Sequence, residues 1–210
     1  MTDAQPLNGP ARFPNAAFDV VALAASAGGL QALIRVLGGL PRDFGAATVI
    51  VQHLDPRHRS LIADIFGRRT PLKVKEAEEG DQLVPGRVFT APPNRHLLVN
   101  PDGSLSLSQS ELVHFVRPSA DLLFESVAAS YKDRVIGVVL SGTGADGSMG
   151  LRAIKKMGGT IIVQDEKTSE FFGMPGAAIE TGTVDFVLPI EEIPPALVSL
   201  VMGRESISDE

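Results

Sequence analysis

Three short runs of apolar residues, rich in Val, Ile and Ala, each end in a cluster of turn-forming residues. The runs are residues 19–25, 48–52 and 135–140. Each run is followed by apolar residues that recur at the three- and four-residue spacing of a helix. Continuous apolar strands that alternate with helices are typical of a parallel sheet with both faces covered. The pattern therefore predicts an α/β fold, with three α/β/α layers around a mainly parallel, Rossmann-like sheet.

The stretch 87–108 breaks this rhythm. It contains short β-like pieces joined by clusters of Pro, Asn, Asp and Gly: residues 88–90, 96–99 and 105–107. Because such clusters are typical of tight turns, we interpret the stretch as an antiparallel hairpin excursion from the main sheet. Residues 120–130 are then predicted to form a helix that Ser119 caps, and residues 160–164 and 184–188 to form two more strands.

Length and composition suit a single domain. The chain has 210 residues and is 44% hydrophobic, which is enough for one sizeable core. We assign the domain to residues 19–202. Residues 1–18 mix polar residues with Pro and Gly, and residues 203–210 are polar, so we expect a flexible leader and a polar tail.

Composition and charge also argue against several classes of function. The chain has no cysteine, which excludes disulfides, thiolate metal sites and thiol nucleophiles. Its formal net charge is −6 without a run of Lys or Arg, whereas duplex-binding proteins usually carry a basic stripe. There is no signal peptide and no apolar run of about 18 residues. We therefore expect a cytoplasmic protein that binds no nucleic acid and does not insert into a membrane.

Residues in the turns and loops just after the predicted strands carry the candidate chemistry. In parallel sheets, ligands bind beyond the carboxyl ends of the strands, and here those positions hold Ser26, His53 and Asp146. A hydroxyl, an imidazole and a carboxylate at one sheet edge are the parts of a nucleophilic triad. We therefore predict Ser26 as the nucleophile, His53 as its base and Asp146 as the residue that orients the imidazole.

Each of these residues also has a structural interpretation. Ser26 precedes two glycines and could cap the following helix, and Asp146 could cap the helix that begins near Met149. His53 could be a structural hydrogen-bonding residue. Asp165 competes with Asp146 as the orienting carboxylate.

A metal site has little support in the sequence. His53, Asp55 and His58 match zinc-ligand spacing only weakly, and Asp55 is a further competitor for the orienting role. The turn after the first strand would also suit a phosphate, but the glycine patterns of nucleotide-binding loops are absent. We expect no metal and no cofactor, and a nucleotide-binding domain remains a rival interpretation.

Two glycine-rich turns are candidates for stabilising an oxyanion. Gly28 and Gly29 would let a substrate approach the backbone at a helix N-terminus, and the loop 141–147 carries three glycines. The apolar pair in the segment 171–175 could pack in the core or line a substrate cleft, and the sequence leaves both open.

Six motifs occur in order along the chain and together resemble one known family. They are Ala25-Ser26-Ala27-Gly28-Gly29, Gln52-His53, Ala91-Pro92-Pro93-Asn94-Arg95-His96, Arg117-Pro118-Ser119-Ala120-Asp121, residues 141–150 and Phe172-Gly173-Met174-Pro175. The chain resembles the CheB family of chemotaxis protein-glutamate methylesterases over about residues 19–189. The resemblance implies the same triad and a substrate in the form of methylated helices of the cytoplasmic part of chemoreceptors. It also implies hydrolysis of glutamate γ-methyl esters, with deamidation of receptor glutamines as a second expected activity.

The family pattern also suggests which residues contact the substrate. We expect oxyanion and substrate contacts from Ala27, Gly28, Thr143, Gly144 and Met174. Ala27 stands where the family commonly has Thr, and Thr143 stands where it often has Met.

The family's usual receiver domain is not expected in this chain. No segment before residue 19 has the length or apolar periodicity for it, so we expect a site that the chain itself leaves uncovered. The alternative function is that of a CheB-like regulatory or binding module in a non-chemotaxis signalling pathway.

Overall fold

A seven-stranded sheet forms the centre of the computed structural model, which describes residues 12–14, 16–53 and 61–203. The strand order is β3-β4-β2-β1-β7-β8-β9, and every neighbouring pair is parallel. The strands are β1 (Val20–Ala25), β2 (Ala47–Gln52), β3 (Lys73–Glu76), β4 (Arg87–Thr90), β7 (Val135–Val139), β8 (Thr160–Gln164) and β9 (Phe186–Leu188). A separate antiparallel hairpin consists of β5 (His96–Val99) and β6 (Leu105–Ser108).

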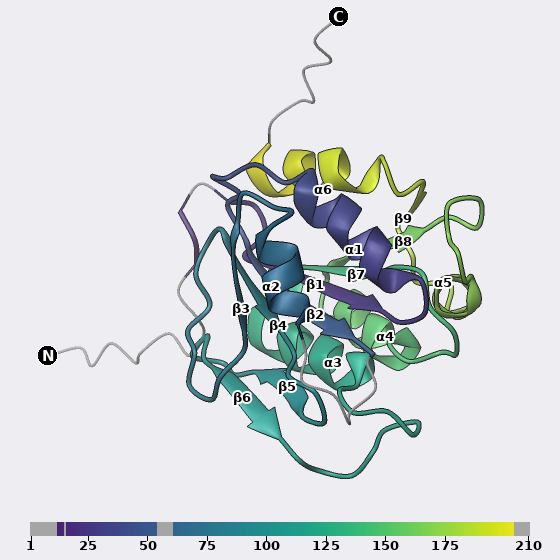
Figure 1. Ribbon diagram of the computed structural model, residues 1–210, viewed down its shortest axis with the longest axis horizontal. Coiled ribbons are helices and arrows are strands. Elements are labelled where there is room, and N and C mark those ends of the chain that lie inside the picture. The colour runs from purple at the N-terminus through teal and green to yellow at the C-terminus, as the bar shows by residue number, and fades with distance from the viewer. Residues whose placement is uncertain (1–11, 15, 54–60, 204–210) are drawn as a thin grey trace, which may run out of the picture.

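Helices cover both faces of the sheet (Figure 1). One face carries α1 (Gly29–Gly38), α2 (Ile62–Gly67) and α6 (Ile193–Met202). The other carries α3 (Ala120–Tyr131), which η1 (Lys132–Arg134) follows, α4 (Ser148–Lys156) and α5 (Gly173–Glu180), with the hairpin beside α3. The predicted α/β/α architecture and its mainly parallel sheet are confirmed.

Burial on both faces explains why the central strands are apolar without interruption. All six residues of β1 are buried. Val20 and Ala22 belong to the core beneath α3 and α4, whereas Val21 and Leu23 belong to the core beneath α1 and α6. Successive side chains of a strand point to opposite faces, so a strand between two helical layers must be apolar at every position.

The structure corrects the interpretation of the stretch 87–108 as wholly antiparallel. β4 lies in the main sheet and pairs in parallel with both β2 and β3, and only β5 and β6 form the antiparallel hairpin. Val88 and Phe89 are both fully buried, one in each core, and only the main sheet offers cover on both faces. Burial therefore decides the pairing partner of β4, and the turn residues around it do not.

Other predicted elements hold with small shifts at their ends. Ser119 caps α3, since its side chain accepts a hydrogen bond from the Leu122 amide. Four elements have no counterpart in the predictions, namely β3, α5, α6 and the short η1. β3 was missed because every residue of Lys73–Glu76 except Val74 is charged, and α5 because it begins in a Gly- and Pro-containing segment.

The segment before β1 contacts the domain at several points. Phe13 packs against the core beneath α3, and its amide donates to the Asp19 carboxylate at 2.8 Å. Arg134 binds the same carboxylate and the carbonyl oxygen of Ala16. The division at residues 18 and 19 stays a prediction.

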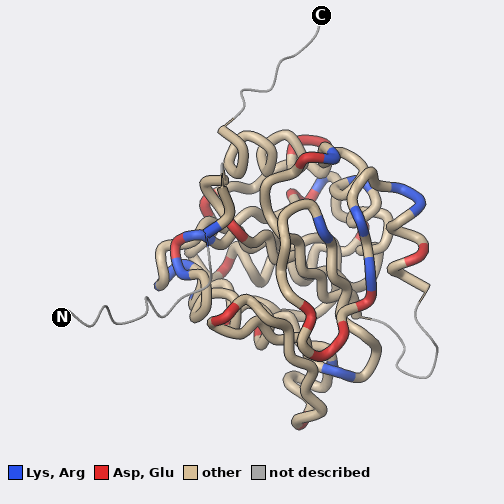
Figure 2. The backbone as a smooth tube through the Cα atoms, turned by 90° about the vertical axis from the view of Figure 1, so that its left-hand side faces the viewer, with Lys and Arg blue, Asp and Glu red and all other residues tan. Residues whose placement is uncertain are grey.

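The described residues show neither segregated charge nor a helix suited to a membrane. Lys and Arg are interspersed with Asp and Glu over the described part of the chain (Figure 2). Among the same residues, no helix combines the length and the apolar character needed to cross a membrane.

Candidate active site

The register of the sheet brings Ser26 and His53 to neighbouring positions. Ala25, the last residue of β1, pairs with Gln52, the last residue of β2. Ser26 therefore follows β1 at the same level of the sheet at which His53 follows β2. Adjacent strands lie about 4.8 Å apart. The His53 amide donates to the carbonyl oxygen of Ala25 at 3.1 Å, which continues the pairing by one residue.

The turn after β1 is held through its backbone. The Ser26 amide donates to the Ser141 carbonyl oxygen at 3.0 Å, and the Ser26 carbonyl oxygen accepts from the Gly29 amide at 2.9 Å. The Gln52 side-chain amide donates to the carbonyl oxygens of Ser26 at 2.8 Å and of His53 at 3.0 Å. One side chain thus joins the two strand ends.

The Ser26 side chain does not cap α1. The N-cap residue is Gly28, with φ 71°, and no side-chain hydrogen bond caps the helix. The Ser26 hydroxyl makes no hydrogen bond to another described residue, His53 included. The structural interpretation of Ser26 as a helix cap is therefore wrong, and its hydroxyl is left for another role.

Both glycines of the turn are required by close packing. A Cβ atom on Gly28 would lie 2.7 Å from the Ser141 hydroxyl and 2.8 Å from the Glu170 side chain. On Gly29 it would lie 2.5 Å from the Ala25 Cβ atom. A cleft of about 420 Å³ opens beside Gly28, and its mostly polar lining includes Lys167, Thr168 and Glu170.

His53 is bound to Asp146 across the sheet edge. The distance from His53 Nε2 to Asp146 Oδ2 is 2.8 Å, and the Asp146 side chain is 5% exposed. Because the carboxylate accepts, a neutral His53 carries its hydrogen on Nε2, and Nδ1 is the ring nitrogen left as an acceptor.

The first turn of α3 holds the other side of the Asp146 carboxylate. Oδ2 accepts from the Ala120 amide at 2.6 Å, and Oδ1 accepts from the Asp121 amide at 3.1 Å and the Ser119 hydroxyl at 2.9 Å. Burial by itself raises the pKa of Asp146, but hydrogen bonds from His53 and the two amides outweigh it and leave that pKa below its usual value. Asp146 is therefore an ionised carboxylate at the N-terminus of a helix, where negative charge is favoured.

Asp146 does not cap the helix that follows it. The N-cap of α4 is Gly147, without a side-chain hydrogen bond. The alternative that Asp146 caps the helix after it is thus wrong, because its carboxylate binds the start of α3 instead of the start of α4. Asp165, the competing orienter, accepts instead from the amide and hydroxyl of Thr168 in its own turn.

The loop after β7 packs against the segment that begins α5. The Gly142 amide donates to the Phe171 carbonyl oxygen at 3.0 Å, and the Met174 amide donates to Gly142 at 2.8 Å. A Cβ atom on Gly142 would lie 2.4 Å from Met174 Sδ, so Met174 packs directly on the loop. Thr143 and Gly144 lie exposed at its tip.

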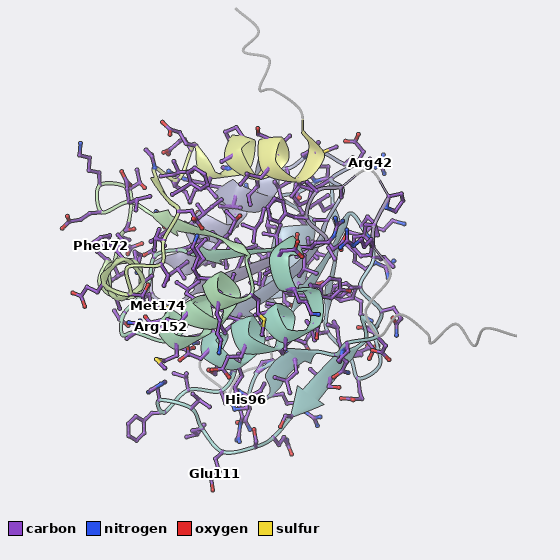
Figure 3. All side chains as sticks on the ribbon, turned by 180° about the vertical axis from the view of Figure 1, so that it is seen from behind. Arg42, His96, Glu111, Arg152, Phe172 and Met174 are labelled. Atoms are coloured by element: carbon purple, nitrogen blue, oxygen red, sulfur yellow. The ribbon has the colours of Figure 1, made fainter. Side chains whose placement is uncertain are left out.

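The aromatic pair lies at the surface. Phe171 is 41% exposed and Phe172 is half-buried, which argues against packing of the pair in the core. Figure 3 shows Phe172 and Met174 near each other at the edge where α5 lies. Of the predicted contact residues, Ala27 also touches this region, because its carbonyl oxygen accepts from the Ser141 hydroxyl at 2.9 Å.

Several residues that support the site were not predicted as site residues. Gln52 and Gln164 end β2 and β8, and the Gln164 side chain accepts from the Ser141 amide at 2.9 Å. A buried polar residue at the end of an apolar strand is the signal that could have found both. Ser119 was predicted only as a cap, and no pattern in the sequence links it to Asp146.

Metal ligation finds no support in the described part of the chain. No group of three or more His, Asp or Glu side chains gathers there in a way that could hold an ion. Asp55 and His58 of the weak zinc pattern lie outside the described residues.

The sequence and the fold of the chain are similar to those of known proteins. The family model of the CheB methylesterases matches residues 21–197. The chain belongs to the CheB methylesterase family. The resemblance predicted from the six motifs is confirmed, and so is the prediction of a methylesterase at the level of the family.

Individual relatives cover most of the chain. A putative protein-glutamate methylesterase/protein-glutamine glutaminase of Leptospira interrogans is 42% identical over 183 residues, which are 87% of this chain and 95% of the relative. A protein-glutamate methylesterase/protein-glutamine glutaminase of Anaeromyxobacter dehalogenans is 47% identical over 182 residues, which are 87% of this chain and 53% of that protein. The CheB methylesterase catalytic domain of Thermotoga maritima has a TM-score of 0.85 at 37% identity, covering 88% of this chain and 99% of the domain.

Proposed function

We propose that this chain is a serine methylesterase that hydrolyses glutamate γ-methyl esters on the helices of chemoreceptors in the cytoplasm. Ser26 is the nucleophile, His53 its general base and Asp146 the residue that orients the imidazole. The observation that carries the proposal is the 2.8 Å bond between His53 and Asp146, formed where the strand register sets His53 beside Ser26.

The reaction runs in two halves through an acyl-enzyme. His53 Nδ1 takes the proton of the Ser26 hydroxyl as the oxygen attacks the ester carbonyl carbon, and a tetrahedral oxyanion forms. The imidazolium then protonates the departing methoxide, and methanol leaves. Water attacks the acyl-enzyme by the same route and releases the glutamate carboxylate and free Ser26.

Asp146 acts in both halves through the imidazole. Its ionised carboxylate keeps the hydrogen of neutral His53 on Nε2, so that Nδ1 can accept the serine proton. It also stabilises the imidazolium that each half-reaction produces. The nitrogen assignment follows from the contact, because Nε2 already faces the carboxylate.

The oxyanion would form beside the two glycine-rich turns. Backbone amides near Ala27 and Gly28 lie at the N-terminus of α1, where developing negative charge is favoured. Thr143 and Gly144 form the opposite wall, and Met174 fixes the loop that carries them. Backbone donors explain how the site tolerates Ala27 and Thr143 in place of the family's more common Thr and Met.

A second activity is proposed on the same chemistry. The Leptospira and Anaeromyxobacter relatives carry names that include protein-glutamine glutaminase. Deamidation of a receptor glutamine would form the same acyl-enzyme and release ammonia in place of methanol. Because ammonia leaves less readily than methanol, we expect the glutamine amide to react more slowly than the methyl ester.

The test is methanol release from a chemoreceptor cytoplasmic fragment that carries radiolabelled methyl esters. We expect release that depends on the chain and ceases when Ser26 is replaced by Ala. Release no faster than in buffer would overturn the proposal. If a fluorophosphonate labels Ser26 in that case, the chain is an active hydrolase of another pathway; if it does not, the chain is a binding module.

A further inference from the structure

Two of the sequence motifs are not used by the triad itself. One ends in His96 and the other contains Ser119. The structure brings both to the start of α3, directly behind the Asp146 carboxylate. Their contacts form a continuous chain of hydrogen bonds that ends at His53.

Ser119 is the inner member of this chain. Its side chain is completely buried, and its hydroxyl donates to Asp146 Oδ1 at 2.9 Å. The same oxygen atom of Ser119 accepts from the Leu122 amide at a longer 3.5 Å. The hydroxyl hydrogen can point in only one direction, and that direction is the carboxylate.

His96 is the outer member and fixes the backbone of Ser119. The Ser119 amide donates to His96 Nδ1 at 3.1 Å, and His96 Nε2 donates to the Glu111 carbonyl oxygen at 3.0 Å. The ring is fully buried, and this pair of contacts requires a neutral ring with its hydrogen on Nε2. Figure 3 shows His96 and Glu111 on the hairpin side of α3.

We propose that Ser119 and His96 are positioning residues that hold the Asp146 carboxylate in the orientation which His53 requires. With the Ser119 hydroxyl and the Asp121 amide on Oδ1, the carboxylate cannot rotate without breaking both bonds, and Oδ2 stays directed at His53. The inference rests on the proposed triad, which it extends outward by two residues.

A purely structural role would look different. A helix cap or a buried hydroxyl stabilises the fold, and its loss lowers the melting temperature without changing how fast the remaining folded protein reacts. A positioning residue changes the reactivity of the nucleophile in the folded protein. Ser130 provides the matched control, because its buried hydroxyl lies on the same helix and donates to the Val99 carbonyl oxygen at 2.9 Å.

The experiment measures the rate at which an alkyl fluorophosphonate labels the full-length folded chain, with reversible binding separated from the covalent step. Ser119→Ala should lower the covalent rate constant roughly 10- to 100-fold, as for the loss of a hydrogen bond to a charged group, with the binding constant unchanged. Ser119→Thr keeps the hydroxyl and should restore at least half of the rate. Ser130→Ala should label at the wild-type rate.

His96 gives a second arm that does not remove the hydroxyl. His96→Asn keeps an acceptor near the position of Nδ1 and should label faster than His96→Leu, which has none. If Ser119→Ala does not fold, the comparison of the two His96 variants tests the positioning role.

The outcomes separate the two proposals. A wild-type chain that is not labelled on Ser26 contradicts the proposed triad. Wild-type labelling on Ser26 together with an unchanged rate in Ser119→Ala, or equal rates in the two His96 variants, leaves the triad intact and overturns the positioning role.

Discussion

The two halves of the candidate site are held in different ways. Asp146 accepts hydrogen bonds from one hydroxyl and two amides at the start of α3, and it also binds His53. Both oxygens of its carboxylate therefore have hydrogen-bond partners. Ser26 is fixed only through its backbone, and its hydroxyl is unbonded among the described residues. Asp146, which must carry charge, is thus held in position before the reaction begins. The Ser26 hydroxyl, which must form and break a covalent bond, is held by no hydrogen bond from the described residues.

The same contrast appears in the choice of residues. The carboxylate half uses polar side chains that are buried in the fold, such as Ser119 and His96. The nucleophile half uses glycines, because Gly28, Gly29 and Gly142 have no room for a side chain. Substitutions should therefore act on stability and activity together in the first half, and mainly on activity at the nucleophile itself.

The largest effect is expected for Ser26→Ala. Methanol release should fall by about 10⁴- to 10⁶-fold, because members of a triad act as a unit. Since the hydroxyl has no partner among the described residues, the free energy of unfolding should change by less than about 0.5 kcal/mol. Urea unfolding checks the second statement, with Ser199→Ala on α6 as the control. Near-normal turnover in folded Ser26→Ala would remove Ser26 from the mechanism.

Asp146→Asn should come next. It should lower turnover by about 10³- to 10⁴-fold, because an amide cannot hold His53 in the required tautomer. Stability should fall by about 1 to 3 kcal/mol, since the Asn amide group meets donors where the carboxylate accepted. Asp133→Asn, on the exposed η1, is the control and should change neither turnover nor stability.

The pH dependence of stability follows from the lowered pKa of Asp146. Burial opposes ionisation, but the hydrogen bonds from His53 and the amides of α3 favour it, so the folded pKa lies below the unfolded one. Its contribution to stability is present above about pH 4 and is lost as the pH falls through the folded pKa. Acid should therefore destabilise the wild-type chain more than Asp146→Asn. A constant difference between the two down to pH 3 would contradict this.

Asp121 is a neighbouring carboxylate with the opposite balance. Burial, together with the charge of Asp146, raises its pKa above the usual value despite the hydrogen bond from the Gly150 amide. A raised folded pKa means that the ionised group destabilises the fold at neutral pH, and that stability is regained as the pH falls through the folded pKa toward the unfolded one.

Asp121→Asn should therefore stabilise the chain at pH 7, and the gain should shrink toward pH 4. Its amide oxygen can still accept from Gly150. Urea unfolding at the two pH values measures the effect. A loss of stability at pH 7 would show that Asp121 is held as firmly as Asp146.

The smallest effect is expected for Thr143→Ala. The Thr143 side chain is exposed at the tip of its loop, and the proposed contribution to the oxyanion comes from the backbone. Methanol release should change by less than roughly threefold. A larger loss would show that the hydroxyl itself contacts the substrate.

Much of the fold could be predicted because its central strands are buried on both faces. β1, β2 and β7 read as uninterrupted apolar runs, and the residues after them mark the carboxyl edge. The partner of β4 could not be predicted in the same way. It depends on the contact of β4 with β2 and β3, which no local pattern encodes.

The site divides in the same manner. Ser26 and His53 directly follow neighbouring strands, and Asp146 lies in the loop after β7, so topology brings all three to the same edge of the sheet. Ser119 and His96 become part of the site only when α3 packs against the loop after β7. Their role is a tertiary contact, and in the sequence they resemble an ordinary cap and an ordinary buried histidine.

The measurement that tests the central claim most directly is the position of a covalent adduct. The chain is treated with a fluorophosphonate until methanol release from methylated receptor fragment stops, and the modified residue is identified by peptide mass spectrometry. We predict one phosphonyl group per chain, on Ser26, with the loss of activity proportional to its occupancy. A stoichiometric adduct on another residue, or full methanol release from chains modified at Ser26, would contradict it.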